Sequence, residues 1–200
     1  MHIELTEMLR CPAPHAEAFL VMSTGEMRGR MVRSGVLACP VCQREYPILK
    51  GIVQFSTTGP ARSAAARRAP LPIAAADLQA LLDLSGPGGY VVLLGSAARH
   101  AEGLAELMAG IHFVGVNAGA DDEALPVLSL LECAGSLPLR NAMARAVVVG
   151  GDRLEPAWLA EAQRVLLPGR RLVVESDAVQ VPAGVTRLAL ERGMFVGERR

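Results

Sequence analysis

The feature that most constrains this chain is an alternation of short apolar runs with amphipathic segments over its second half. The apolar runs lie at 90–94, 111–116, 127–131, 144–149 and 171–175. Runs with almost no polar residue are typical of strands buried on both faces of a sheet. Strands that alternate with helices pair in parallel through right-handed crossovers. The sequence therefore predicts an α/β fold with a doubly wound, mainly parallel sheet.

The segments between these runs have helical periodicity and end at turn residues. Leu78, Leu81 and Leu82 stand at i, i+3 and i+4 before a glycine-rich turn at 85–89. A second helix is predicted over 97–108, and a third begins at Pro156 and continues to Leu167. After Asp177, the segments 185–190 and 194–196 indicate a closing hairpin.

A different pattern occupies the first 55 residues, where three of the four cysteines lie. Cys39 and Cys42 form a CxxC turn, and Cys11 and His15 lie in a proline-rich segment. Three thiolates and one imidazole are an accepted set for structural zinc, and a module this small needs a metal for much of its stability. In the alternative interpretation the cysteines are small buried residues or oxidisable thiols. His2 is either a substitute ligand or solvated.

Composition sets the organisation and limits the partners. We expect a small β-rich module over 1–55, a linker rich in Ala, Arg, Pro, Ser and Thr over 56–72, and an α/β domain over 73–200. Lys plus Arg and Asp plus Glu number 20 each, so no strong signal for nucleic acid exists. Without a secretory signal or an apolar run long enough to span a bilayer, we expect a cytoplasmic, soluble protein.

Three phrases of the first module carry a resemblance to a known family. They are Leu9-Arg10-Cys11-Pro12, residues 35–42, and Glu45-Tyr46-Pro47-Ile48 with Gly51-Ile52. Residues 8–53 resemble the zinc-ribbon family that includes small activator subunits of tRNA and protein methyltransferases. The resemblance implies a zinc-ribbon-like fold with Cys11, His15, Cys39 and Cys42 as ligands. Pro14 departs from the family pattern, because it stands where the second cysteine of the first knuckle is usual.

The second part of the chain carries another resemblance. Residues 159–175 read as a helix, a Pro-Gly turn and a strand, and residues 134–139 precede the strand at 144–149. These phrases resemble class I S-adenosylmethionine-dependent methyltransferases, with 134–139 like the family's loop beside the adenine. The resemblance implies a Rossmann-like fold whose cofactor positions are Gly95, Ala97, Asn117 and Cys133.

The residues at those positions depart from what the cofactor needs. The family's glycine-rich turn keeps only Gly95, with Ala97 and Arg99 at the later glycine positions. Asn117 stands in place of a carboxylate that would bind ribose hydroxyls, and Cys133 in place of an aspartate. Ala144-Arg145 stands where the family has Phe-Asp. We therefore expect that the chain does not bind S-adenosylmethionine.

The other polar residues do not indicate a chemical reaction. Arg99 and His100 either hold an anion at a helix N-terminus or are solvated at the mouth of a disused cleft, which we favour. We expect a satisfied structural histidine at 112, a packed thiol at Cys133 and a core position for Trp158. No catalytic residue is assigned.

The sequence thus favours a non-catalytic methyltransferase-like protein that acts as a protein-binding or assembly subunit. Two alternatives remain open: an active S-adenosylmethionine-dependent methyltransferase of unknown acceptor, and an activator subunit of a separate methyltransferase.

Overall fold

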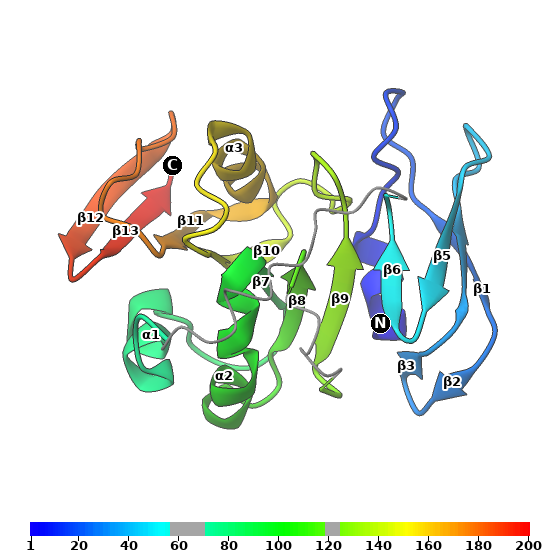
Figure 1. The fold of residues 1–200 in the computed structure, drawn as a ribbon, viewed down its shortest axis with the longest axis horizontal. Coiled ribbons are helices and arrows are strands. Elements are labelled where there is room, and N and C mark those ends of the chain that lie inside the picture. Colours follow the sequence, from blue (N-terminus) through cyan, green and yellow to red (C-terminus); the bar gives the residue numbers. More distant parts are fainter. Residues whose placement is uncertain (57–70, 119–124) are drawn as a thin grey trace.

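The chain forms one long twisted sheet with helices on both faces of its larger part (Figure 1). The computed structural model describes residues 1–56, 71–118 and 125–200. Eleven strands lie in the order β1-β4-β5-β6-β9-β8-β7-β10-β11-β13-β12. The predicted fold class, a doubly wound and mainly parallel sheet preceded by a β-rich segment, is confirmed.

The parallel centre of the sheet follows the predicted apolar runs. Its strands are β7 (Tyr90–Leu94), β8 (His112–Val116), β9 (Leu128–Glu132), β10 (Ala144–Val149) and β11 (Leu166–Val174). Their spatial order, β9-β8-β7-β10-β11, is that of the first five strands of a Rossmann sheet, with the switch point between β7 and β10. The predicted hairpin is β12 (Val185–Glu191) and β13 (Met194–Arg199), and β13 pairs antiparallel with β11.

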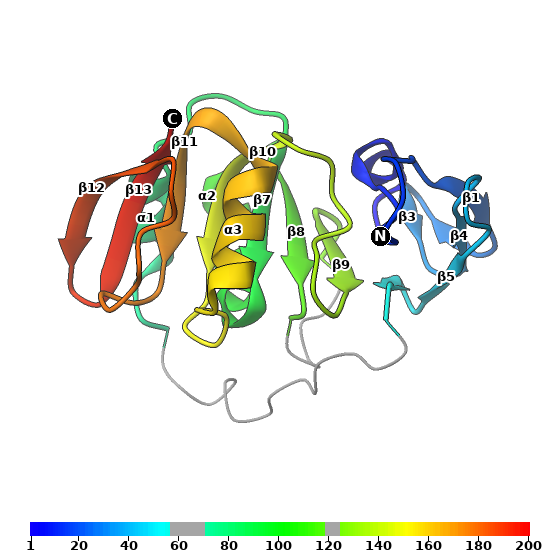
Figure 2. The same ribbon diagram turned by 90° about the horizontal axis from the view of Figure 1, so that it is seen from above.

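The central strands are buried on both faces, β11 only over its last residues, 172–174. Val92 and Leu94 belong to one core cluster, and Val91 and Leu93 belong to the other. The helices α1 (Ala75–Leu82) and α2 (Ala101–Leu107) cover one face. The helix α3 (Pro156–Val165) covers the opposite face, where Trp158 joins the core as expected (Figure 2).

The N-terminal segment is a small β structure. It begins with the 3-10 helix η1 (Ile3–Met8). Its strands are β1 (Val21–Thr24), β2 (Met27–Arg28), β3 (Met31–Val32), β4 (Gly35–Ala38), β5 (Glu45–Leu49) and β6 (Ile52–Gln54). β2 and β3 form a separate ribbon, whereas β1, β4, β5 and β6 are antiparallel neighbours that extend the main sheet.

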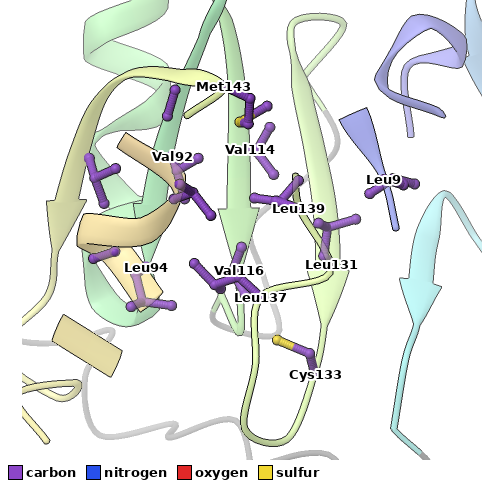
Figure 3. Close-up of a cluster of buried hydrophobic side chains, with 14 of the residues drawn as sticks. Leu9, Val92, Leu94, Val114, Val116, Leu131, Cys133, Leu137, Leu139 and Met143 are labelled. Carbon is purple, nitrogen blue, oxygen red and sulfur yellow. The ribbon is translucent and has the colours of Figure 1, made fainter. Parts of the chain in front are cut away.

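The two parts of the chain are joined along β6 and β9, which the sequence did not predict. These strands pair in parallel, with Val53 opposite Leu131. A second line of backbone contacts joins Leu9 to Leu139, and the Arg140 amide donates to the Met8 carbonyl at 2.9 Å. Figure 3 shows Leu9 on the same face as Leu131 and Leu139. We call these contacts the seam.

Two element boundaries differ from those predicted. The segment after β7 begins as a 3-10 helix, η2 (Gly95–His100), before α2 starts at Ala101. The turn at Pro168-Gly169 lies inside β11, because Leu166 already pairs with Ala144 and the register then jumps to Arg171 opposite Ala146.

Three further expectations have different outcomes. The boundaries at 55 and 73 remain a prediction, and most of the expected linker lies outside the described residues. No helix among those residues is long and apolar enough to cross a membrane.

Candidate functional site

The four predicted metal ligands come together at one end of the N-terminal segment. Cys39 and Cys42 belong to the turn after β4, while Cys11 and His15 belong to the segment after η1. The four ligand atoms all lie within 4.8 Å of one another. The Cys11 and Cys42 sulfurs are 3.7 Å apart, and the His15 Nε2 is 3.5 Å from the Cys39 sulfur.

These distances fit a tetrahedral zinc ion. Zinc bonds to sulfur and nitrogen of the usual lengths place such ligand atoms about 3.6 to 3.8 Å apart. The His15 Nδ1 lies 2.6 Å from the Ala16 carbonyl, an arrangement that leaves Nε2 free to ligate. The Tyr46 hydroxyl lies 3.2 Å from the Cys11 sulfur and can support a thiolate.

The electrostatics of the cluster favour a thiolate at Cys39. Burial raises the pKa of this thiol. The N–H groups of Cys42 and Val41 and the neighbouring thiols lower the pKa by more than burial raises it, to about 6. Burial raises the pKa of Cys11. Bound zinc would supply structural cross-linking of the two knuckles, and Cys11, His15, Cys39 and Cys42 are the residues that would hold it.

The predicted cofactor positions lie at the carboxyl ends of β7, β8 and β9, beside the switch point. All four positions, Gly95, Ala97, Asn117 and Cys133, are buried. In such a sheet this edge is the usual ligand crevice. The described residues place the chain's own side chains against each position.

The Asp152 side chain pairs with a backbone N–H group of the turn that follows β7. Its carboxylate Oδ1 accepts a hydrogen bond of 2.7 Å from the Ser96 amide. Gly95 has φ +65°, and a Cβ built there would meet the Asp152 carboxylate and lie 2.6 Å from the Arg153 Cγ. A Cβ on Gly150 would lie 2.8 Å from the Ala97 amide. The 150–153 turn therefore packs directly on the turn that a cofactor would need to approach.

Glu175, at the end of β11, closes the same crevice from the other side. Its Oε1 is 2.9 Å from the His100 Nε2, and its Oε2 accepts from the Ser96 hydroxyl and the Gly151 amide, each at 3.3 Å. The His100 side chain is fully buried. The expectation of a solvated His100 was therefore wrong. Ser96 and His100 therefore contact the same carboxylate.

Asn117 and Cys133 are also used internally. Asn117, with φ +53°, accepts a hydrogen bond of 3.0 Å from the Cys133 amide through its side-chain oxygen. Burial, together with the charge of Glu161, raises the pKa of the Cys133 thiol to about 12, which makes it unreactive. Cys133 is a packed thiol, as expected. Asn117 ties the ends of β8 and β9 together.

The loop at 134–139 is held by α3. Glu161 accepts a hydrogen bond of 2.7 Å from the Leu137 amide, and the Arg164 guanidinium donates to the Leu137 and Leu139 carbonyls. Leu137 and Leu139 are buried in the core beside Val116 and Leu131 (Figure 3).

Several residues differ from their sequence interpretation. Arg145 donates to the carbonyls of Ser85, Gly86, Pro87 and Gly88, at the opposite edge of the sheet from the crevice. His2 is buried beside His112 rather than solvated, and neither contributes to the cysteine cluster. His112 is not a satisfied histidine, because its Nδ1 has no hydrogen-bond partner among the described residues.

Sequence reasoning missed Asp152 and Glu175 as neighbours of the crevice. The signal was present, because Glu175 is the last residue of the strand predicted at 171–175 and Asp152 comes shortly after the strand predicted at 144–149. The carboxyl ends of parallel strands meet at one edge.

No family model and no curated protein matches the chain. Solved structures similar to it include several methyltransferases and the [4+2]-cyclase SpnF. One is the complex between the Haloferax volcanii Trm112 methyltransferase activator and a methyltransferase, with 21% identity, a TM-score of 0.40, and 50% of each chain covered.

Two other similar structures have somewhat higher TM-scores, both below 0.5. A SAM-dependent methyltransferase from Aquifex aeolicus has 12% identity and a TM-score of 0.48, with 62% of this chain and 88% of that chain covered. A geranyl diphosphate methyltransferase in complex with SAM has 12% identity and a TM-score of 0.49, covering 63% and 84%. Identities and scores this low carry no argument about activity, ligand or partner.

Proposed function

We propose that this chain is a methyltransferase-like protein that does not transfer methyl groups and acts as a protein-binding or assembly subunit. The observation that carries the first part is the closure of the switch-point crevice by Asp152. The Asp152 carboxylate accepts a hydrogen bond from the Ser96 amide, and this amide lies on the turn where a cofactor would contact the backbone.

Two further features support a crevice without a cofactor. The Glu175 carboxylate is hydrogen-bonded to His100 and Ser96, and the side-chain oxygen of Asn117 accepts a hydrogen bond from the Cys133 amide. A ligand would have to break these hydrogen bonds and leave buried polar groups without partners, which costs about 1–3 kcal/mol for each group.

Calorimetric titration of the purified chain with S-adenosylmethionine and S-adenosylhomocysteine tests this part. The proposal predicts no binding heat for either compound. Asp152→Ala removes the carboxylate from the turn, while Asp177→Ala, which removes an exposed aspartate, serves as the control. Micromolar binding to the wild-type chain would overturn the proposal and favour the active methyltransferase.

The partner part of the proposal rests on the two open edges of the sheet. β12 forms one edge and carries Leu188 and Leu190 at 49% and 42% exposure, and β1 forms the other with Val21 at 62%. An open edge with exposed apolar side chains favours pairing with a strand of another chain. The strand β6, in contrast, is already paired with β5 and β9 of the same chain.

Cross-linking in cells identifies which edge is used. A chain with Leu188→Lys and Leu190→Lys should lose the neighbours that wild type captures, because lysines on an edge strand oppose pairing. Val21→Lys is the comparison at the other edge. Identical neighbours for all three chains would remove the edges from the proposal.

In the zinc part of the proposal, the cysteine cluster is a structural zinc site that stabilises the N-terminal segment. Elemental analysis of the purified chain and of Cys39→Ser tests it, with zinc expected in the first and absent from the second.

A further inference from the structure

A second group of metal-ligating side chains lies at the seam, away from the cysteine cluster. His2, Glu4 and His112 each present one ligand atom, and these atoms lie within 4.8 Å of one another. His2 and Glu4 come from the start of the chain, and His112 begins β8. The two imidazole rings have centroids 4.4 Å apart and are tilted by 47°.

The backbone fixes His2 in this place. Its amide donates a buried hydrogen bond of 2.9 Å to the Ser129 hydroxyl of β9, and it forms a bridge with Met31. The side chain is therefore held against β8 by contacts on two sides. Such preorganisation is what a ligand set on separate segments requires.

Both histidines have an unused ring nitrogen. The Nδ1 atoms of His2 and His112 are buried and have no hydrogen-bond partner among residues 1–56, 71–118 and 125–200. A buried polar nitrogen without a partner costs free energy whether it carries a proton or a lone pair. His2 as a residue is only 5% exposed, so bulk water does not satisfy it.

The Glu4 carboxylate stands beside the two imidazoles and offers the third ligand. The Glu4 Oε2 lies 3.8 Å from the His2 Nδ1, too far for a hydrogen bond. Its other oxygen pairs with Arg30. The Tyr90 ring also lies beside His112, with ring centroids 5.9 Å apart.

We propose that His2, Glu4 and His112 form a second metal site, for a borderline divalent ion such as zinc, cobalt or nickel. Two imidazoles and one carboxylate are ligands that suit these ions, and water completes the coordination. An ion bound here cross-links the N-terminal segment to β8 and strengthens the seam. This site is independent of the proposed lack of methyl transfer.

Cobalt titration of the full chain tests the site. The chain is first loaded with about one molar equivalent of zinc, which the thiolates bind more tightly than the imidazoles and carboxylate do, and Co²⁺ is then added. Occupation of the histidine site gives visible d–d absorption without the sulfur-to-cobalt charge-transfer band. That band appears only if cobalt replaces zinc at the cysteines, so the spectrum separates the two sites.

The variants define the expected result. Glu4→Gln and His112→Asn each weaken cobalt binding, Glu4→Gln by at least about 10-fold and His112→Asn to no detectable absorption. Glu4 is exposed, so Glu4→Gln keeps the fold even if His112→Asn does not. The matched control is Glu26→Gln, because Glu26 is also an exposed glutamate paired with an arginine.

Two results would overturn the proposal. One is wild-type chain that shows no d–d absorption beyond the cysteine signal, which would mean that the histidines are a metal-free pair. The other is cobalt binding that Glu4→Gln leaves as strong as in Glu26→Gln.

Discussion

Leu9→Ala should destabilise the whole chain, although Leu9 lies in the N-terminal segment. Leu9 is fully buried and pairs with Leu139 across the seam. The substitution removes three carbons, worth about 0.8 kcal/mol each, and leaves a cavity that adds to the loss. We expect a loss of about 3 kcal/mol in the free energy of unfolding.

Two optical signals report the two parts of the chain separately. Trp158, the only tryptophan, lies in α3 on the sheet domain. Thiolate-to-cobalt absorption of a cobalt-loaded cysteine cluster reports the N-terminal segment. In urea, both signals should have the same midpoint in wild type and should move together to lower urea in Leu9→Ala.

The control is Leu188→Ala, which truncates a half-exposed leucine far from the seam and should change stability by less than about 0.5 kcal/mol. The reasoning is refuted if the Trp158 midpoint stays unchanged in Leu9→Ala while the cobalt midpoint falls. That result would mean that the two parts unfold independently and that the seam contributes little.

Three further predictions address single contacts. Arg145→Ala should lower the free energy of unfolding by about 1–2 kcal/mol, because the guanidinium donates to four consecutive carbonyls of the 85–88 turn; Arg170→Ala is the control in urea unfolding. Tyr46→Phe should weaken zinc binding by about 10-fold in a chelator competition, since it removes the hydroxyl beside Cys11; unchanged affinity would exclude that support. Burial raises the pKa of Glu161, but Arg164 and the Leu137 amide lower it by more, so the pKa of this carboxyl lies below its usual value. A carboxylate whose pKa is lower in the folded chain than in the unfolded chain stabilises the fold at pH values above the unfolded pKa of about 4.3. This stabilisation is lost as the pH falls through the folded pKa. Glu161→Gln should therefore be less stable than wild type at pH 7, with a deficit that shrinks below about pH 4; a constant deficit would contradict the pairing.

The sheet centre could be predicted because its signal is local. A run such as Tyr90–Leu94, which is almost entirely apolar, fits a strand covered on both faces whatever its neighbours are. The cysteine cluster could also be predicted, because a CxxC turn fixes two ligands by sequence spacing alone.

The seam and the crevice could not be predicted, because they depend on contacts between distant segments. β6 has only three residues, and nothing in Ile52-Val53-Gln54 specifies Leu130–Glu132 as its partner. His100 was misplaced for the same reason, since its partner Glu175 lies 75 residues later in the chain. The burial of His2 likewise depends on Ser129 and His112.

The central claim is that Asp152 keeps the Ser96 amide away from any cofactor. The most direct measurement is the amide signal of Ser96 in an isotope-labelled chain, followed by NMR during addition of S-adenosylmethionine. The account predicts an amide shift that stays constant at millimolar ligand. A shift that changes and saturates with ligand would contradict it, because it would show the cofactor replacing the Asp152 carboxylate.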